Sequence, residues 1–152
     1  MKKNKYLIPG LALLFIVIMG IYFLVHPSYQ KSLQAQYYYN VGGYDEAYKL
    51  ASQAFSMDVY NRMASTIMAQ SKTSMKYQKY IKQAQEYMTQ INAIVDKKSI
   101  NDADRARIKL MSEVMVDSYK KLAPSVITDK KLVEQAASYY SDFEKLLEKV
   151  SR

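Results

Sequence analysis

The chain has 152 residues, a formal net charge of +8 at pH 7, no cysteine and a single histidine, His26. These counts exclude disulfides and cysteine nucleophiles, and they exclude a His-based triad or a His-rich metal site after His26. Only four glycines and three prolines occur. Because most of the remaining residues are good helix formers and no long stretch alternates apolar and polar residues, the sequence predicts an all-α protein.

The first predicted element is an uncharged apolar segment, residues 6–25. At about 1.5 Å per residue, a helix of this length spans the hydrocarbon core of a bilayer, which is about 30 Å thick. The exit from the segment, Tyr-Phe-Leu-Val-His-Pro-Ser, offers no pair of small residues of the Ala-x-Ala kind for a signal peptidase. The pattern therefore favours a retained transmembrane anchor over a removable signal.

The charges on either side of this segment predict its orientation. Lys2, Lys3 and Lys5 precede it, whereas the residues that follow offer only His26 and then Lys31. Positive flanks stay in the cytoplasm. We therefore expect a single-pass protein of a bacterial inner membrane, with a cytoplasmic basic tail at 1–5 and a periplasmic helical domain at 27–152.

Six further helices are predicted after the anchor, joined by short links. Their expected ranges are 28–40, 44–57, 59–70, the region after 74 to about 95, 100–122 and 128–150. The residues that start or stop them are Gly42-Gly43, a cap at Asp58, the polar stretch 71–74, a capping-box-like pair of Ser99 and Asp102, and Pro124. The predicted fold is a transmembrane helix followed by a stack of about three antiparallel helical hairpins.

One segment carries a recognisable spacing. Residues 42–58 read Gly-Gly-Tyr-Asp-Glu-Ala-Tyr-Lys-Leu-Ala-Ser-Gln-Ala-Phe-Ser-Met-Asp, which resembles the second half of a tetratricopeptide repeat. The resemblance implies a repeat at about 28–61, with Ala47 and Ala54 where two helices cross closely. It also implies that Ala35 and Tyr38 take the small and aromatic core positions of the first helix.

The rest of the chain departs from that repeat. Val59 stands where the repeat usually has proline, and Ile81 stands where a following repeat would place a small residue. The second hairpin, 59–95, is therefore expected to be degenerate or lengthened, and 100–150 matches no repeat consensus. A generic helical hairpin at 28–61 is the alternative, and it leaves the fold class unchanged.

The resemblance also implies a binding surface. The inner face of the first helix would line a groove for peptides or partner helices, through Tyr29, Gln36, Tyr39 and Asn40. The consecutive tyrosines 37–39 point about 100° apart around a helix, so at least one is expected to be exposed as a binding residue. The alternative is that these amphipathic side chains cover a small core or touch the membrane interface.

No sequence motif indicates catalysis. The chain has no phosphate-binding loop, no dinucleotide-binding glycine pattern and no nucleophile elbow, and acidic pairs such as Asp45-Glu46 suit helix N-termini. We expect no enzyme activity, cofactor, metal, nucleic acid or small-molecule substrate. Instead we expect a scaffold or adaptor that binds protein partners near the membrane, similar to accessory components of envelope machines such as bacterial flagellar motors. The alternatives are an assembly chaperone for another inner-membrane protein and a small extracytoplasmic ligand-binding domain.

Overall fold

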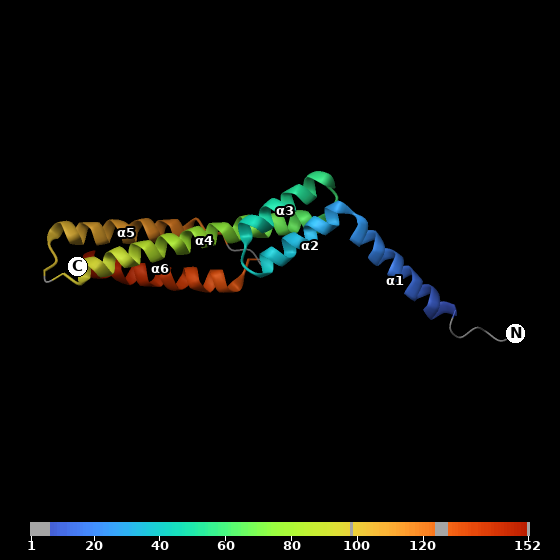
Figure 1. Cartoon of the computed structure of the whole chain (residues 1–152). Helices are drawn as coiled ribbons and strands as arrows, with labels where there is room; N and C mark the ends of the chain where they lie inside the picture. Colours follow the sequence, from blue (N-terminus) through green and yellow to red (C-terminus); the bar gives the residue numbers. More distant parts are fainter. Residues whose placement is uncertain (1–6, 98, 124–127, 152) are drawn as a thin grey trace. The chain divides into compact units, whose positions relative to one another are not determined.

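The computed structural model describes residues 7–97, 99–123 and 128–151, and these residues contain helices and no strand (Figure 1). The helices are α1 (Leu7–Val25), α2 (Pro27–Asn40), α3 (Tyr44–Met57), α4 (Arg62–Val95), α5 (Asp102–Lys120) and α6 (Lys130–Ser151). The all-α prediction is confirmed for these residues. The expected basic tail at 1–5 and the expected helix stop at Pro124 lie outside them.

The chain forms two compact units, Met1–Ser71 and Lys72–Arg152. The boundary falls inside α4 and within the segment 27–152, which the sequence predicts as one helical domain. The expected interruption at 71–74 is wrong, because α4 runs through it as a continuous helix. This stretch is polar, but it holds no glycine or proline that would end a helix. The expected second hairpin at 59–95 is consequently a single helix preceded by a turn.

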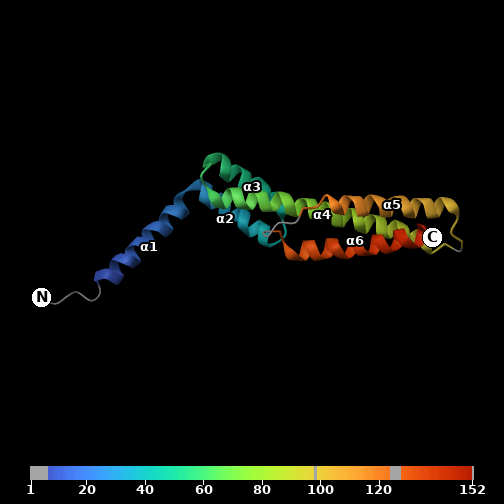
Figure 2. The same ribbon diagram turned by 180° about the vertical axis from the view of Figure 1, so that it is seen from behind.

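Unit 1 is built around close packing of small side chains. α2 and α3 lie side by side in both views (Figures 1 and 2), and the link between them turns at Gly42, whose φ of 82° is accessible to glycine at little cost. Ala35, Ala47, Ala51 and Ile67 form the buried cluster. Alanines here let the helix backbones approach closely, as the repeat-like spacing predicts for Ala35 and Ala47.

A buried polar network joins α2, α3 and the start of α4. The Asn61 Nδ2 donates to Ser28 Oγ at 2.8 Å and to Ser32 Oγ at 3.0 Å, while Ser28 Oγ donates to the carbonyl of Ala54 at 2.9 Å. Asn61 Oδ1 accepts from the backbone N–H of Ala64 at 3.1 Å, so Asn61 is the N-cap of α4. Asp58, the expected cap, instead accepts from the N–H of Tyr60 within the preceding turn.

Unit 2 is a bundle of the remainder of α4 with α5 and α6, and the three helices share one apolar core. The core contains Tyr77, Ile91, Met115 and Phe143, each at most 2% exposed. Three tyrosines at this core contact one another through their rings. Tyr119 stacks on Tyr140 with 4.4 Å between ring centroids, and the centroid of the Tyr119 ring lies 5.7 Å from that of Tyr80.

The capping box at the start of α5 lies two residues beyond its expected position. Asn101 Oδ1 accepts from the Asp104 N–H at 2.7 Å, and the Asp104 carboxylate accepts in return from the Asn101 N–H. Lys97 Nζ also donates to Asp104 Oδ1 at 2.6 Å. The pairing expected between Ser99 and Asp102 is wrong, since the later register gives the capping box a charged partner, Lys97, from the link that follows α4.

Candidate interaction surface

Helix α2 divides cleanly into a side that packs and a side that does not. Ser28, Ser32 and Ala35 are buried against α3 and the start of α4. Successive side chains of an α-helix point about 100° apart around its axis. Residues on the side of α2 opposite these three therefore point away from unit 1. The structure therefore separates the tyrosines of α2 according to the side on which each lies.

Of the four residues predicted to bind a partner, Tyr29, Gln36 and Asn40 lie between these two sides, whereas Tyr39 lies on the packed side. Tyr29 is half-buried, with its ring centroid 6.2 Å from that of His26. Gln36 Nε2 donates to Asn40 Oδ1 at 2.9 Å on the exposed flank of the helix. Tyr39 is half-buried, and its ring lies 5.2 Å from that of Tyr44. The structure thus brings Gln36 and Asn40 together and turns Tyr39 toward the core.

The expectation that Tyr38 occupies the core is wrong. Tyr38 is 39% exposed, whereas Tyr39 packs against the alanine cluster of unit 1. The reason is the phase of α2, which is set by burial of Ser28, Ser32 and Ala35 and places Tyr39, four residues after Ala35, on the same side. Tyr38 instead lies over the chain at Gly43, where a Cβ would come within 3.4 Å of the tyrosine ring.

The side of α2 opposite the core forms an exposed surface, which we call the α2 outward face. Its apolar residues are exposed by 47% at Leu33, 63% at Tyr37, 39% at Tyr38 and 62% at Val41. Together with Gln34, the first three line an open hollow of about 620 Å³. The three consecutive tyrosines were the available sequence signal for this surface. The repeat-based register, however, placed Tyr38 in the core and Tyr39 on the binding surface, and the structure reverses the two.

The α2 outward face carries no lysine, arginine, aspartate or glutamate. Lys31 is the only charged residue in α2, and its Nζ donates to Gln53 Oε1 of α3 at 2.8 Å. By contrast, the first turn of α3 contains Asp45 and Glu46, and Glu46 forms an exposed ion pair with Lys49. A helix face in water usually carries charged residues. The composition of the outward face is therefore unusual for a surface that meets only water.

Helix α1 exposes apolar side chains around its whole circumference. Twelve large apolar or aromatic side chains between Ile8 and Val25 are 44% to 79% exposed. Within the described part of the chain, no helix by itself meets the length and apolarity expected of a membrane span. Residues 8–22 of α1 and 27–40 of α2 meet those criteria only as a pair, which is bent by 83°.

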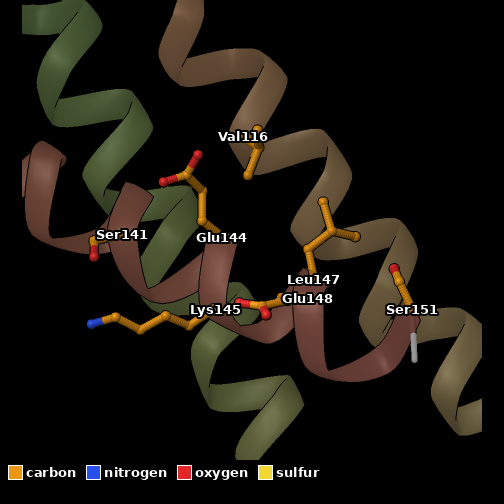
Figure 3. Close-up of a pocket in the computed structure, with 7 residues that line it drawn as sticks. All are labelled: Val116, Ser141, Glu144, Lys145, Leu147, Glu148 and Ser151. Carbon is orange, nitrogen blue, oxygen red and sulfur yellow. The ribbon is translucent and has the colours of Figure 1, made fainter.

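A second hollow, of about 550 Å³, lies between α5 and α6 in unit 2. Figure 3 shows Val116 and Leu147 facing the space between the two ribbons, while the Lys145 side chain extends away from it. Glu144 accepts a short hydrogen bond from the Tyr140 hydroxyl. Among the described residues, no group of three or more acidic, histidine or cysteine side chains is placed to hold a metal ion.

The perturbed pKa values belong to packing and capping residues. Burial raises the pKa of Tyr80 far above its ordinary value, and its hydroxyl is buried with no hydrogen-bond partner in the described structure. The hydrogen bond to Glu144 raises the pKa of Tyr140, and the hydrogen bond from Lys97 lowers the pKa of Asp104. Each shift moves the pKa of its group further from pH 7, so none of the three supplies an acid or base that titrates near pH 7.

No known protein family, curated protein or solved structure matches the chain.

Proposed function

We propose that this protein is a single-pass scaffold or adaptor of a bacterial inner membrane, which holds protein partners of an envelope machine beside the bilayer. Its N-terminus lies in the cytoplasm and residues 27–152 lie in the periplasm. The observation that supports the anchor most strongly is the exposure of apolar side chains all around α1. A helix that is apolar on every side suits a membrane or the core of a large protein.

The magnitudes favour a bilayer over water for α1. Burial of one large apolar side chain is worth about 1.5–3 kcal/mol. The twelve side chains along α1 are 44% to 79% exposed, so their burial together is worth about as much as, or more than, the total stability of a typical domain, which is about 5–15 kcal/mol. Lys2, Lys3 and Lys5 before the apolar segment support the proposed orientation.

The packing of unit 1 supports the scaffold part of the proposal. Ala35, Ala47 and Ala54 are each 0% exposed, as a tetratricopeptide-like crossing of two helices requires. Domains of that kind use helix faces to bind peptides or partner helices. The proposed contact surface is the flank of α2 that carries Tyr29, Gln36 and Asn40, of which Asn40 is exposed and the other two are half-buried. Tyr39, the fourth residue expected there, packs against the alanine cluster of unit 1. The bacterial flagellar motor is one envelope machine that such a scaffold would serve, by analogy of fold.

Two experiments test this function. A C-terminal alkaline phosphatase fusion should be active and a cytoplasmic reporter at the same position inactive; the reverse pattern would refute the topology. Copurification of the full chain in mild detergent, followed by mass spectrometry, should recover a stoichiometric protein partner.

The contact surface has a matched test in the same copurification. The double variant Gln36→Ala/Asn40→Ala should reduce recovery of the partner, because these two side chains form an exposed hydrogen-bonded pair on α2. Lys49→Ala, an exposed change on α3, is the control and should leave recovery unchanged. A partner present only in trace amounts, and released during assembly, would favour the assembly chaperone. Equal recovery with both variants would refute the assigned contact surface.

A further inference from the structure

The chemistry of the α2 outward face fits the interfacial layer of a bilayer. Tyr37 and Tyr38 combine large apolar rings with polar tips, and Leu33 and Val41 add aliphatic surface beside them. Tyrosines concentrate where hydrocarbon meets headgroups, because the ring prefers the apolar layer and the hydroxyl prefers the wet one. The neutral Gln34 among them costs less to place at that depth than a charged side chain would.

The connection between α1 and α2 keeps this face near the proposed anchor. Only His26 separates the two helices, and backbone hydrogen bonds cross the junction from His26 N to the carbonyl of Tyr22 and from Gln30 N to that of His26. The bend of 83° between the helices places α2 nearly parallel to the membrane plane when α1 crosses it. A helix so placed must turn one of its sides toward the lipid.

The distribution of charge selects which side that is. The core side of α2 is covered by α3, whose first turn holds Asp45 and Glu46. Turning that side toward the bilayer would push carboxylates toward lipid, at a cost that the outward face does not incur. Lys31, the single cation of α2, points to Gln53 of α3 and so leaves the outward face uncharged.

We propose that the α2 outward face lies in the headgroup region of the bilayer, so that α2 is an interfacial helix continuing from the transmembrane anchor. This inference rests on the proposed membrane anchor. It assigns Leu33, Tyr37, Tyr38 and Val41 to lipid contact, and it leaves partner binding to the flank that carries Gln36 and Asn40. Such helices lie in the plane of the interface, with their apolar side at the boundary between headgroups and acyl chains.

The absence of tryptophan from the chain makes a direct test available. Single Tyr37→Trp and Val41→Trp variants of the full chain are reconstituted into vesicles of phosphatidylcholine and phosphatidylglycerol. A fraction of the lipid carries a nitroxide quencher either near the headgroup or deep in the acyl chain. Both variants should show a blue-shifted emission maximum and a loss of emission with the headgroup quencher. Both sites are more than half exposed, so the larger ring needs no rearrangement of the core.

Two further single-tryptophan variants separate failure of the inference from failure of the anchor. Leu14→Trp, in α1, should lose emission with the deep quencher, and Lys49→Trp, on the exposed side of α3, should lose it with neither. Quenching at Leu14→Trp without quenching at Tyr37→Trp or Val41→Trp would overturn the inference and retain the anchor. A blue shift at those two sites without quenching would also overturn it, in favour of a protein partner or a second copy. No quenching at Leu14→Trp would refute the anchor and the inference with it.

Discussion

Replacement of Asn61 by alanine should destabilise unit 1 far more than its position at a helix start alone predicts. Asn61 is 0% exposed, and its amide makes three hydrogen bonds, to Ser28, Ser32 and the N–H of Ala64. The capping bond is worth about 1 kcal/mol. Each of the two bonds to serine adds about 1 kcal/mol. The expected loss is therefore about 3 kcal/mol in the free energy that holds α2, α3 and the start of α4 together.

Hydrogen exchange of the full chain in mild detergent measures this loss segment by segment. A change of about 3 kcal/mol should accelerate exchange in residues 28–57 by roughly a hundredfold where exchange follows the opening equilibrium. Asn101→Ala is the matched control, because Asn101 caps α5 but is exposed, so its loss should cost only about 1 kcal/mol and affect α5. Equal effects of the two substitutions, or unchanged exchange in α2 and α3 with Asn61→Ala, would refute the reasoning.

Two other predictions follow from packing and from titration. Ala47→Leu and Ala54→Leu should each lower the free energy of unfolding of unit 1 by about 1–3 kcal/mol, because both side chains are fully buried. Ala106→Leu, at an exposed site on α5, is the control and should be nearly neutral. Equal thermal stability of all three variants would contradict the close helix crossing. The hydrogen bond from Lys97 lowers the pKa of Asp104 below its ordinary value of 3.8, so the stabilisation is complete above that value and is lost as the pH falls through the lower, folded pKa. Acid should therefore weaken unit 2, and Asp104→Asn should reduce the pH dependence of its thermal unfolding below about pH 5; an unchanged pH profile would contradict this role.

The helical character of this chain and most of its helix boundaries follow from local chemistry. Gly42 and Gly43 end α2 where the sequence predicts, because the turn needs a residue with positive φ. Ala47 and Ala54 are buried as the repeat-like spacing predicts. These features depend on spacing and backbone freedom within a few residues, and such short-range rules are readable from one sequence.

Tertiary contacts decided where α4 begins, whereas helix propensity alone explains why it is not interrupted at 71–74. Asp58 and Asn61 are both good N-caps, and α4 begins after Asn61 because its amide also bonds two buried serines of α2. The polar stretch 71–74 reads as a link, yet α4 continues through it, since serine, threonine and lysine lower helix propensity too little to end a helix.

The candidate surface shows the same division between sequence and tertiary structure. Three consecutive tyrosines established that at least one must face outward, since each points about 100° from the next. Which of them does so depends on the phase of α2 against its neighbours. Burial of Ser28, Ser32 and Ala35 sets that phase, turns Tyr39 inward and leaves Tyr37 and Tyr38 exposed. A helix supplies the angles between its own residues, but only packing against other elements fixes which of those angles is the inside.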